Sequence, residues 1–93
     1  MSDLKAKSPY FEVTDASMVI PLDRVIEREP ADPERLERAR VLMEKAREGQ
    51  GPKRLPIKVV EQGDGTYRVL DGNTTLHVLR ELGETKAVVE LQK

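Results

Sequence analysis

The stretch between Thr66 and Gly83 constrains this chain most, because its hydrophobic pattern changes abruptly from a strand period to a helix period. Its first five residues alternate between two faces, as in a half-buried strand. Leu76, Leu79 and Leu82 then recur at helical spacing, and the glycine that follows is typical of a left-handed C-terminal cap. The sequence therefore predicts a strand that turns directly into a helix.

The junction between the two periods is Asp71-Gly72-Asn73. Gly72 permits a backbone conformation that a Cβ would resist, and we expect Asn73 to be the N-cap of a helix that begins at Thr74. Free N–H groups and the positive end of the helix dipole would then meet at one point, which suits an anion. The alternative is an ordinary capped turn that binds nothing, and local sequence leaves both interpretations open. Asp71 could hold Mg²⁺ through water or could fix the turn by accepting amide hydrogen bonds.

Composition excludes several classes of function. The 93 residues are enough for one domain, and the net charge of −1 gives no general attraction to nucleic acid or to a membrane. The absence of cysteine excludes disulfides, thiolate chemistry and cysteine-ligated metals. No apolar run approaches the length of a membrane span, so we expect a cytoplasmic protein without membrane contact.

The remaining segments predict a small α+β domain preceded by an arm. We expect an arm at residues 1–17 and a domain at residues 18–93, with Asp32 as N-cap and Pro33 as first residue of its first helix. That helix has one apolar face, and strands and a glycine hairpin flank the junction described above. The apolar face consists of Leu36, Ala39, either Leu42 or Met43, and Ala46. Strands are expected at residues 18–22, 56–62, 66–70 and 86–91. The hairpin loop is expected at residues 63–65. The order is β-α-β-β-α-β, with a small mixed sheet and two main helices.

This order of elements resembles the ParB/sulfiredoxin superfamily over residues 18–91. The resemblance rests on an ordered set of short segments: Val19 to Leu22, Asp32-Pro33, Leu55 to Val59, Asp71-Gly72-Asn73 and Leu82-Gly83. It implies that the glycine junction and the helix start hold nucleotide phosphates. The activities that it implies are nucleoside triphosphate binding or hydrolysis, phosphorylation of small or protein substrates, and a nuclease activity.

The sequence departs from that superfamily at the junction itself. In sulfiredoxin a catalytic cysteine followed by His-Arg occupies the positions of Asn73, Thr74 and Thr75, so sulfinic-acid reduction by that mechanism is excluded. The chromosome-partitioning branch has paired arginines where the two threonines stand. Positions that contact nucleotide in sulfiredoxin correspond to Arg35 and Arg38, which could supply the lost charge or could form ordinary helical ion pairs.

We therefore predict that Gly72, Asn73, Thr74 and Thr75 bind the phosphates of ATP or CTP with Mg²⁺, with charge from Arg35 and Arg38. NTP hydrolysis or phosphoryl transfer could follow, and the sequence leaves open whether the domain is an enzyme. Asp71 and His77 could act as an acid or base or as a metal ligand. One of three acids that follow the first strand could face the site as a general base: Asp23, Glu27 or Glu29.

Two other classes of function remain as alternatives. One is a non-catalytic module that binds a protein partner, and the other is a ParB-like nuclease or DNA-associated protein. The sequence names neither the nucleotide, nor a second substrate or partner, nor the oligomeric state.

The isolated domain is expected neither to bind duplex DNA tightly nor to cleave it. Only Lys53, Arg54 and Lys58 form a small basic cluster, and affinity from so few contacts falls by about 0.9 log unit per log of salt for each phosphate engaged. No carboxylate cluster is visible that would hold two metal ions about 3.5–4 Å apart. A supercoiled-plasmid assay with Mg²⁺ and Mn²⁺ tests this. Nicking that disappears in Asp71→Asn would contradict the expectation, whereas nicking that is equal in both proteins would indicate a contaminant.

Overall fold

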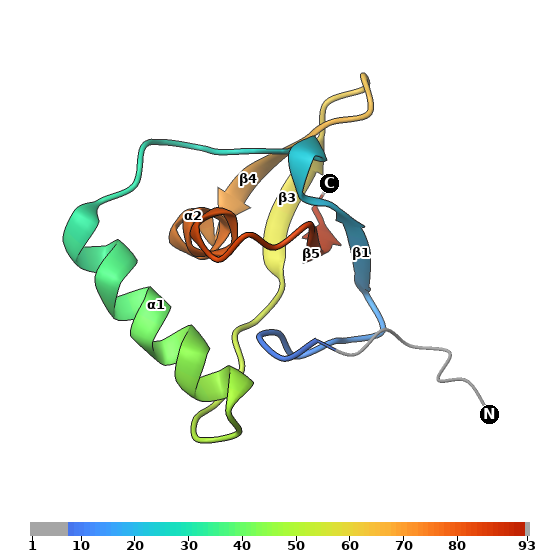
Figure 1. The fold of residues 1–93 in the computed structure, drawn as a ribbon. Coiled ribbons are helices and arrows are strands. Elements are labelled where there is room, and N and C mark those ends of the chain that lie inside the picture. Colours follow the sequence, from blue (N-terminus) through green and yellow to red (C-terminus); the bar gives the residue numbers. More distant parts are fainter. Residues whose placement is uncertain (1–7, 93) are drawn as a thin grey trace.

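One mixed sheet carries both helices on the same face (Figure 1). The structure, a computed structural model, describes residues 8–92. The sheet order is β1-β5-β3-β4-β2, and β3 pairs parallel with β5 and antiparallel with β4. The elements are β1 (Ser17–Pro21), the 3₁₀ turn η1 (Leu22–Arg24), β2 (Val25–Ile26), α1 (Pro33–Arg47), β3 (Ile57–Glu61), β4 (Tyr67–Asp71), α2 (Asn73–Glu81) and β5 (Lys86–Leu91). The expected α+β class is confirmed.

A short fifth strand, β2, was not predicted from the sequence. We expected a charged connection after the first strand, but Val25 and Ile26 pair in parallel with Tyr67 and Arg68 of β4. Two residues are too few to show a period-2 pattern, so the strand is invisible in the sequence. Arg80 of α2 holds this edge by donating to the Val25 carbonyl oxygen at 3.1 Å.

Helix α1 begins as the sequence predicts. The Asp32 side chain accepts a hydrogen bond from the Glu34 N–H at 3.0 Å, and Pro33 is the first helical residue. Of the two alternatives for the apolar face, Met43 is fully buried, whereas Leu42 is 48% exposed. Helix α2 lies between α1 and the sheet, so the apolar face of α1 packs on α2 (Figure 1).

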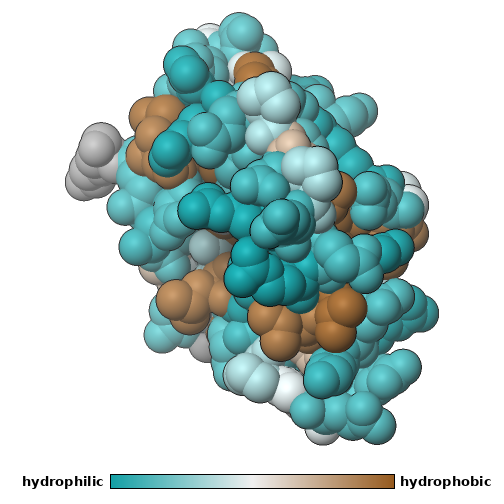
Figure 2. Space-filling view, turned by 90° about the vertical axis from the view of Figure 1, so that its left-hand side faces the viewer, coloured by the Kyte–Doolittle hydropathy of each residue, from teal (hydrophilic) through white to brown (hydrophobic). Residues whose placement is uncertain are grey.

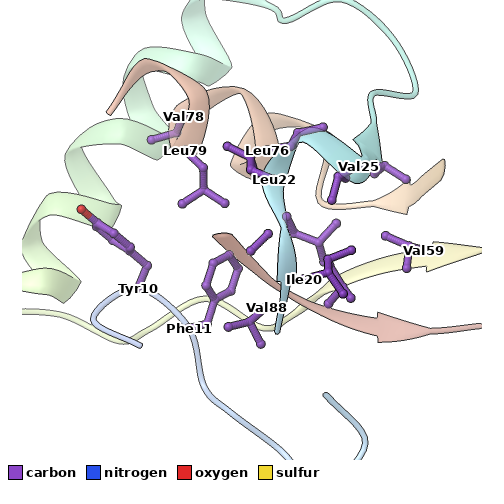
Figure 3. Close-up of a cluster of buried hydrophobic side chains, with 14 of the residues drawn as sticks. Tyr10, Phe11, Ile20, Leu22, Val25, Val59, Leu76, Val78, Leu79 and Val88 are labelled. Carbon is purple, nitrogen blue, oxygen red and sulfur yellow. The ribbon is translucent and has the colours of Figure 1, made fainter. Parts of the chain in front are cut away.

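Two aromatic residues of the predicted arm are part of the core. Tyr10 and Phe11 are each 2% exposed and point into the same apolar cluster as Leu79 and Val88 (Figure 3). Backbone bonds of 2.8 Å from Glu12 N–H to the Arg54 carbonyl and from Arg54 N–H to the Tyr10 carbonyl fix the segment in place. Burial raises the pKa of the Tyr10 hydroxyl, and the carboxylate of Glu84 adds to this effect. Residues 1–7 of the predicted arm lie outside the described residues.

No helix within residues 8–92 is long and apolar enough to cross a membrane.

Phe11→Ala is expected to lower the free energy of unfolding by about 3–5 kcal/mol, because it removes a buried ring and leaves a cavity. Leu55→Ala is the matched control, since that leucine is 72% exposed and its truncation leaves no cavity. Urea titration followed by circular dichroism measures both. Equal midpoints for Phe11→Ala and the parent chain would show that the aromatic pair is not part of the core.

Candidate functional site

The connection from β4 to α2 is a single glycine. Gly72 has φ of +101°, and a Cβ built on it would lie 3.3 Å from the Cα and from two side-chain carbons of Ile57. Side chains rarely adopt that φ, and the contact with the β3 backbone leaves a methyl group little space. Only glycine therefore lets β4 end and α2 begin directly above β3.

The cap of α2 differs from the one that we predicted. Gly72, not Asn73, is the N-cap, and the helix begins one residue earlier than expected. Glycine has no side chain to accept from the first turn, and the first bond within that turn runs from the Leu76 N–H to the Gly72 carbonyl at 3.1 Å. The N–H groups of Asn73, Thr74 and Thr75 therefore have neither a side-chain cap nor a preceding helical carbonyl.

The side chain of Asn73 instead fastens the segment that follows β2. Its Oδ1 accepts from the N–H groups of Arg28 and Glu29 at 2.7 and 3.2 Å, and its Nδ2 donates to the Glu29 carbonyl at 2.8 Å. His77 Nε2 lies 3.0 Å from the same carbonyl, which can only accept, so this nitrogen carries the hydrogen. Asn73 and His77 thus hold the backbone of the segment that follows β2. The Asn73 side chain is occupied there and does not cap the helix.

A depression of about 210 Å³ lies in front of the α2 N-terminus. Three arginines from three separate segments line it, together with two carboxylates and the first turn of α2. The lining residues are Arg28, Glu29, Arg35, Arg54, Leu70, Asp71, Gly72, Asn73, Thr74 and Thr75. The three arginines and the amide end of the helix favour an anion here, and the two carboxylates oppose it in part.

Two of the three arginines are held by the β4–α2 segment. Arg54 Nε donates to the hydroxyl of Thr75 at 3.3 Å, and this hydroxyl belongs to a side chain that is only 3% exposed. Arg28 Nη1 donates to the carbonyl of Leu70 at 2.9 Å. The threonine at the position of a superfamily arginine therefore orients a guanidinium group that comes from the loop before β3.

The structure places the predicted residues unequally. Gly72, Asn73, Thr74, Thr75, Asp71 and Arg35 line the depression, whereas Arg38 and His77 do not. Within residues 8–92 neither Arg35 nor Arg38 forms an ion pair. Among the three acids considered as a base, Glu29 lines the depression, while Glu27 pairs with Arg80 at 2.7 Å and Asp23 lies elsewhere.

Sequence reasoning did not assign Arg28 or Arg54 to this site. Arg54 stood out only as part of a basic cluster, and Arg28 lay in a segment read as a plain connection. Each lies close in sequence to a strand that pairs with β4: Arg28 follows the end of β2, and Arg54 precedes the start of β3. The position of Arg28 beside β4 becomes apparent only once β2 is known, because β2 pairs with β4.

A second depression of about 360 Å³ adjoins the first and shares four lining residues with it, namely Arg54, Asp71, Gly72 and Thr75. Its other lining residues come from α1, β3 and the loop that joins them: Leu42, Pro52, Lys53, Leu55, Pro56 and Lys58. Among residues 8–92, no three histidine or carboxylate side chains come together in a way that could hold a metal ion.

Solved structures with the same architecture are known. SbnI from Staphylococcus aureus, truncated at its C-terminus, has a TM-score of 0.71 and 28% identity over 85% of this chain and 31% of its own. Sulfiredoxin from Arabidopsis thaliana has a TM-score of 0.60 and 22% identity over 83% of this chain and 84% of its own. This chain has the ParB/sulfiredoxin-like fold. It is a variant without cysteine, and it has threonines at the paired-arginine positions.

Another protein with the ParB/sulfiredoxin-like fold is a free serine kinase in complex with AMP, with a TM-score of 0.70 and 19% identity over 90% of this chain and 37% of its own. A variant of that kinase is in complex with ADP. The chain thus spans about a third of the length of SbnI and of the kinase. Comparisons with protein-family models and with curated proteins give no match.

Asn73→Ala is expected to accelerate hydrogen exchange at the amides of Arg28 and Glu29 by about fivefold to tenfold, because each lost hydrogen bond contributes about 1 kcal/mol. Thr74→Ala, next to it on the same helical turn, is expected to leave both amides unchanged. Exchange measured by NMR tests the pair. Unchanged exchange in Asn73→Ala would mean that this side chain does not hold the segment.

Proposed function

We propose that this domain binds a nucleotide whose phosphates occupy the depression lined by Arg28, Arg35 and Arg54. The observation that supports this most is that three arginines line the depression in front of a helix N-terminus without a side-chain cap. Charge-assisted hydrogen bonds from guanidinium groups and free backbone amides are the usual means of phosphate recognition. The complexes of a structurally similar kinase with AMP and ADP give further support.

The proposed division of roles differs from the one that the sequence suggested. The amides of Asn73, Thr74 and Thr75 and the Thr74 hydroxyl would contact phosphate oxygens, and the arginines would supply charge. The Thr75 hydroxyl, which is buried, would act through Arg54. Arg38 has no role in this proposal, because it lies outside the depression.

We propose ATP or CTP with Mg²⁺ as the ligand that fits this set of donors. Mg²⁺ is usually bound by one or two carboxylates together with substrate phosphates. Asp71 is a carboxylate that lines the depression beside the first turn of α2, so it is the residue that would hold the ion. Held there, the ion would supply positive charge that offsets the charge of the phosphates.

A second candidate function is hydrolysis of the terminal phosphate or its transfer to an acceptor. Its support is the Glu29 carboxylate, which lines the depression and whose nearest cationic partner, Arg28, is 3.9 Å away. A carboxylate at that place can accept a proton from an attacking water or hydroxyl group. Asn73 and His77 would then be positioning residues, because they fix the Glu29 backbone.

Arg35→Ala is expected to weaken ADP binding about tenfold, because a hydrogen bond to a charged group contributes about 1.5 kcal/mol or more. Arg38→Ala is the matched control on the same helix, one turn further on, and should bind ADP like the parent chain. Isothermal titration calorimetry with and without Mg²⁺ measures both. Equal weakening in the two variants would indicate a general charge effect and would contradict the proposed site.

The second candidate is tested by phosphate release from ATP. Glu29→Gln keeps the backbone bonds to Asn73 and removes the base, so we expect ADP binding to persist while phosphate release falls at least about a hundredfold. Glu27→Gln is the control. Equal release by Glu29→Gln and the parent chain would exclude Glu29 as the base while leaving nucleotide binding intact.

A further inference from the structure

Beside the nucleotide depression, the surface exposes leucines and cations together. The second depression is lined by Leu42 and Leu55, which are 48% and 72% exposed, and by Pro52 and Pro56. Figure 2 views the α1 side of the molecule and shows hydrophobic patches that interrupt an otherwise hydrophilic surface. Exposed apolar side chains are normal when single, but several around one hollow indicate a binding surface.

The same hollow has a marked excess of positive charge. Lys53, Arg54 and Lys58 line it, and Asp71 is the one carboxylate among its lining residues. Although Lys58 of β3 is the strand partner of Asp71 on β4, the two side chains form no ion pair, and none is found for Lys53 within residues 8–92. Cations that no neighbouring carboxylate neutralises favour an anionic ligand.

We propose that this second depression docks a segment of another protein that carries both acidic residues and large apolar residues. The exposed Leu42, Leu55 and Pro52 would contact the apolar side chains, and the two lysines would contact the carboxylates. The leucines come from different elements, α1 and the loop before β3, and both remain partly in water. A segment that lies across such an open surface can reach both the apolar residues and the lysines.

The second depression lies directly beside the proposed nucleotide site. Arg54, Asp71, Gly72 and Thr75 line both depressions, so the segment would lie directly against the nucleotide site. The inference stands on the apolar and cationic lining alone and does not depend on nucleotide binding.

Fluorescence anisotropy with short fluorescein-labelled peptides tests the proposal. The probe is a Glu-Leu-Asp-Leu repeat, and the two comparison peptides replace its acids by lysine or its leucines by serine. We expect the first peptide to bind the parent chain, and the two comparison peptides to bind at least about tenfold more weakly. Equal binding of the lysine peptide, or no binding of the acidic peptide, would overturn the proposal.

Matched variants locate the binding. Leu55→Ser and Lys58→Glu are each expected to weaken peptide binding at least about tenfold, whereas Leu91→Ser and Lys86→Glu, exposed on β5, should not. Equal losses in the β5 controls would overturn the assignment.

A change in the sedimentation of Leu55→Ser relative to the parent chain would also overturn the assignment, because the surface would then join two copies of this chain. ADP titration of the same variants separates the two sites: if peptide binding fails while ADP binds, only the docking surface is wrong.

Discussion

The close approach of Gly72 to Ile57 is the constraint on which the site depends. A residue with a Cβ would meet the β3 backbone at 3.3 Å and would have to hold φ at +101°, so the chain can pass from β4 to α2 in one residue only with glycine. This short connection places the first amides of α2 next to β3. It also leaves α2 without a side-chain cap, which is the feature that makes the helix start available to an anion.

Much of the fold could be predicted from the sequence because it depends on local chemistry. Asp32-Pro33 starts a helix by capping, Gly83 ends one with φ of +75°, and β5 has the predicted bounds. Features that depend on contacts distant in sequence could not be predicted. Neither the two-residue strand β2 nor the burial of Phe11 has a periodic signal.

The candidate site shows the same division between local and distant information. The glycine junction could be located from the sequence, but its charge could not, because Arg28 and Arg54 are brought to it by the sheet. Thr75 illustrates this most clearly: it occupies a superfamily arginine position, and its buried hydroxyl holds an arginine that enters from another segment. The positive charge at this depression is thus supplied by other positions of the chain than in the superfamily.

The central claim is that nucleotide phosphates meet the first turn of α2, and NMR titration of the ¹⁵N-labelled protein with ADP tests it most directly. The account predicts that the amide signals of Asn73, Thr74 and Thr75 shift more than any others, with the Nε–H signal of Arg54 shifting alongside them. It also predicts that Arg38 and the residues of β5 remain unmoved. If millimolar ADP leaves these α2 amides unchanged while the domain is folded, the phosphate site does not exist.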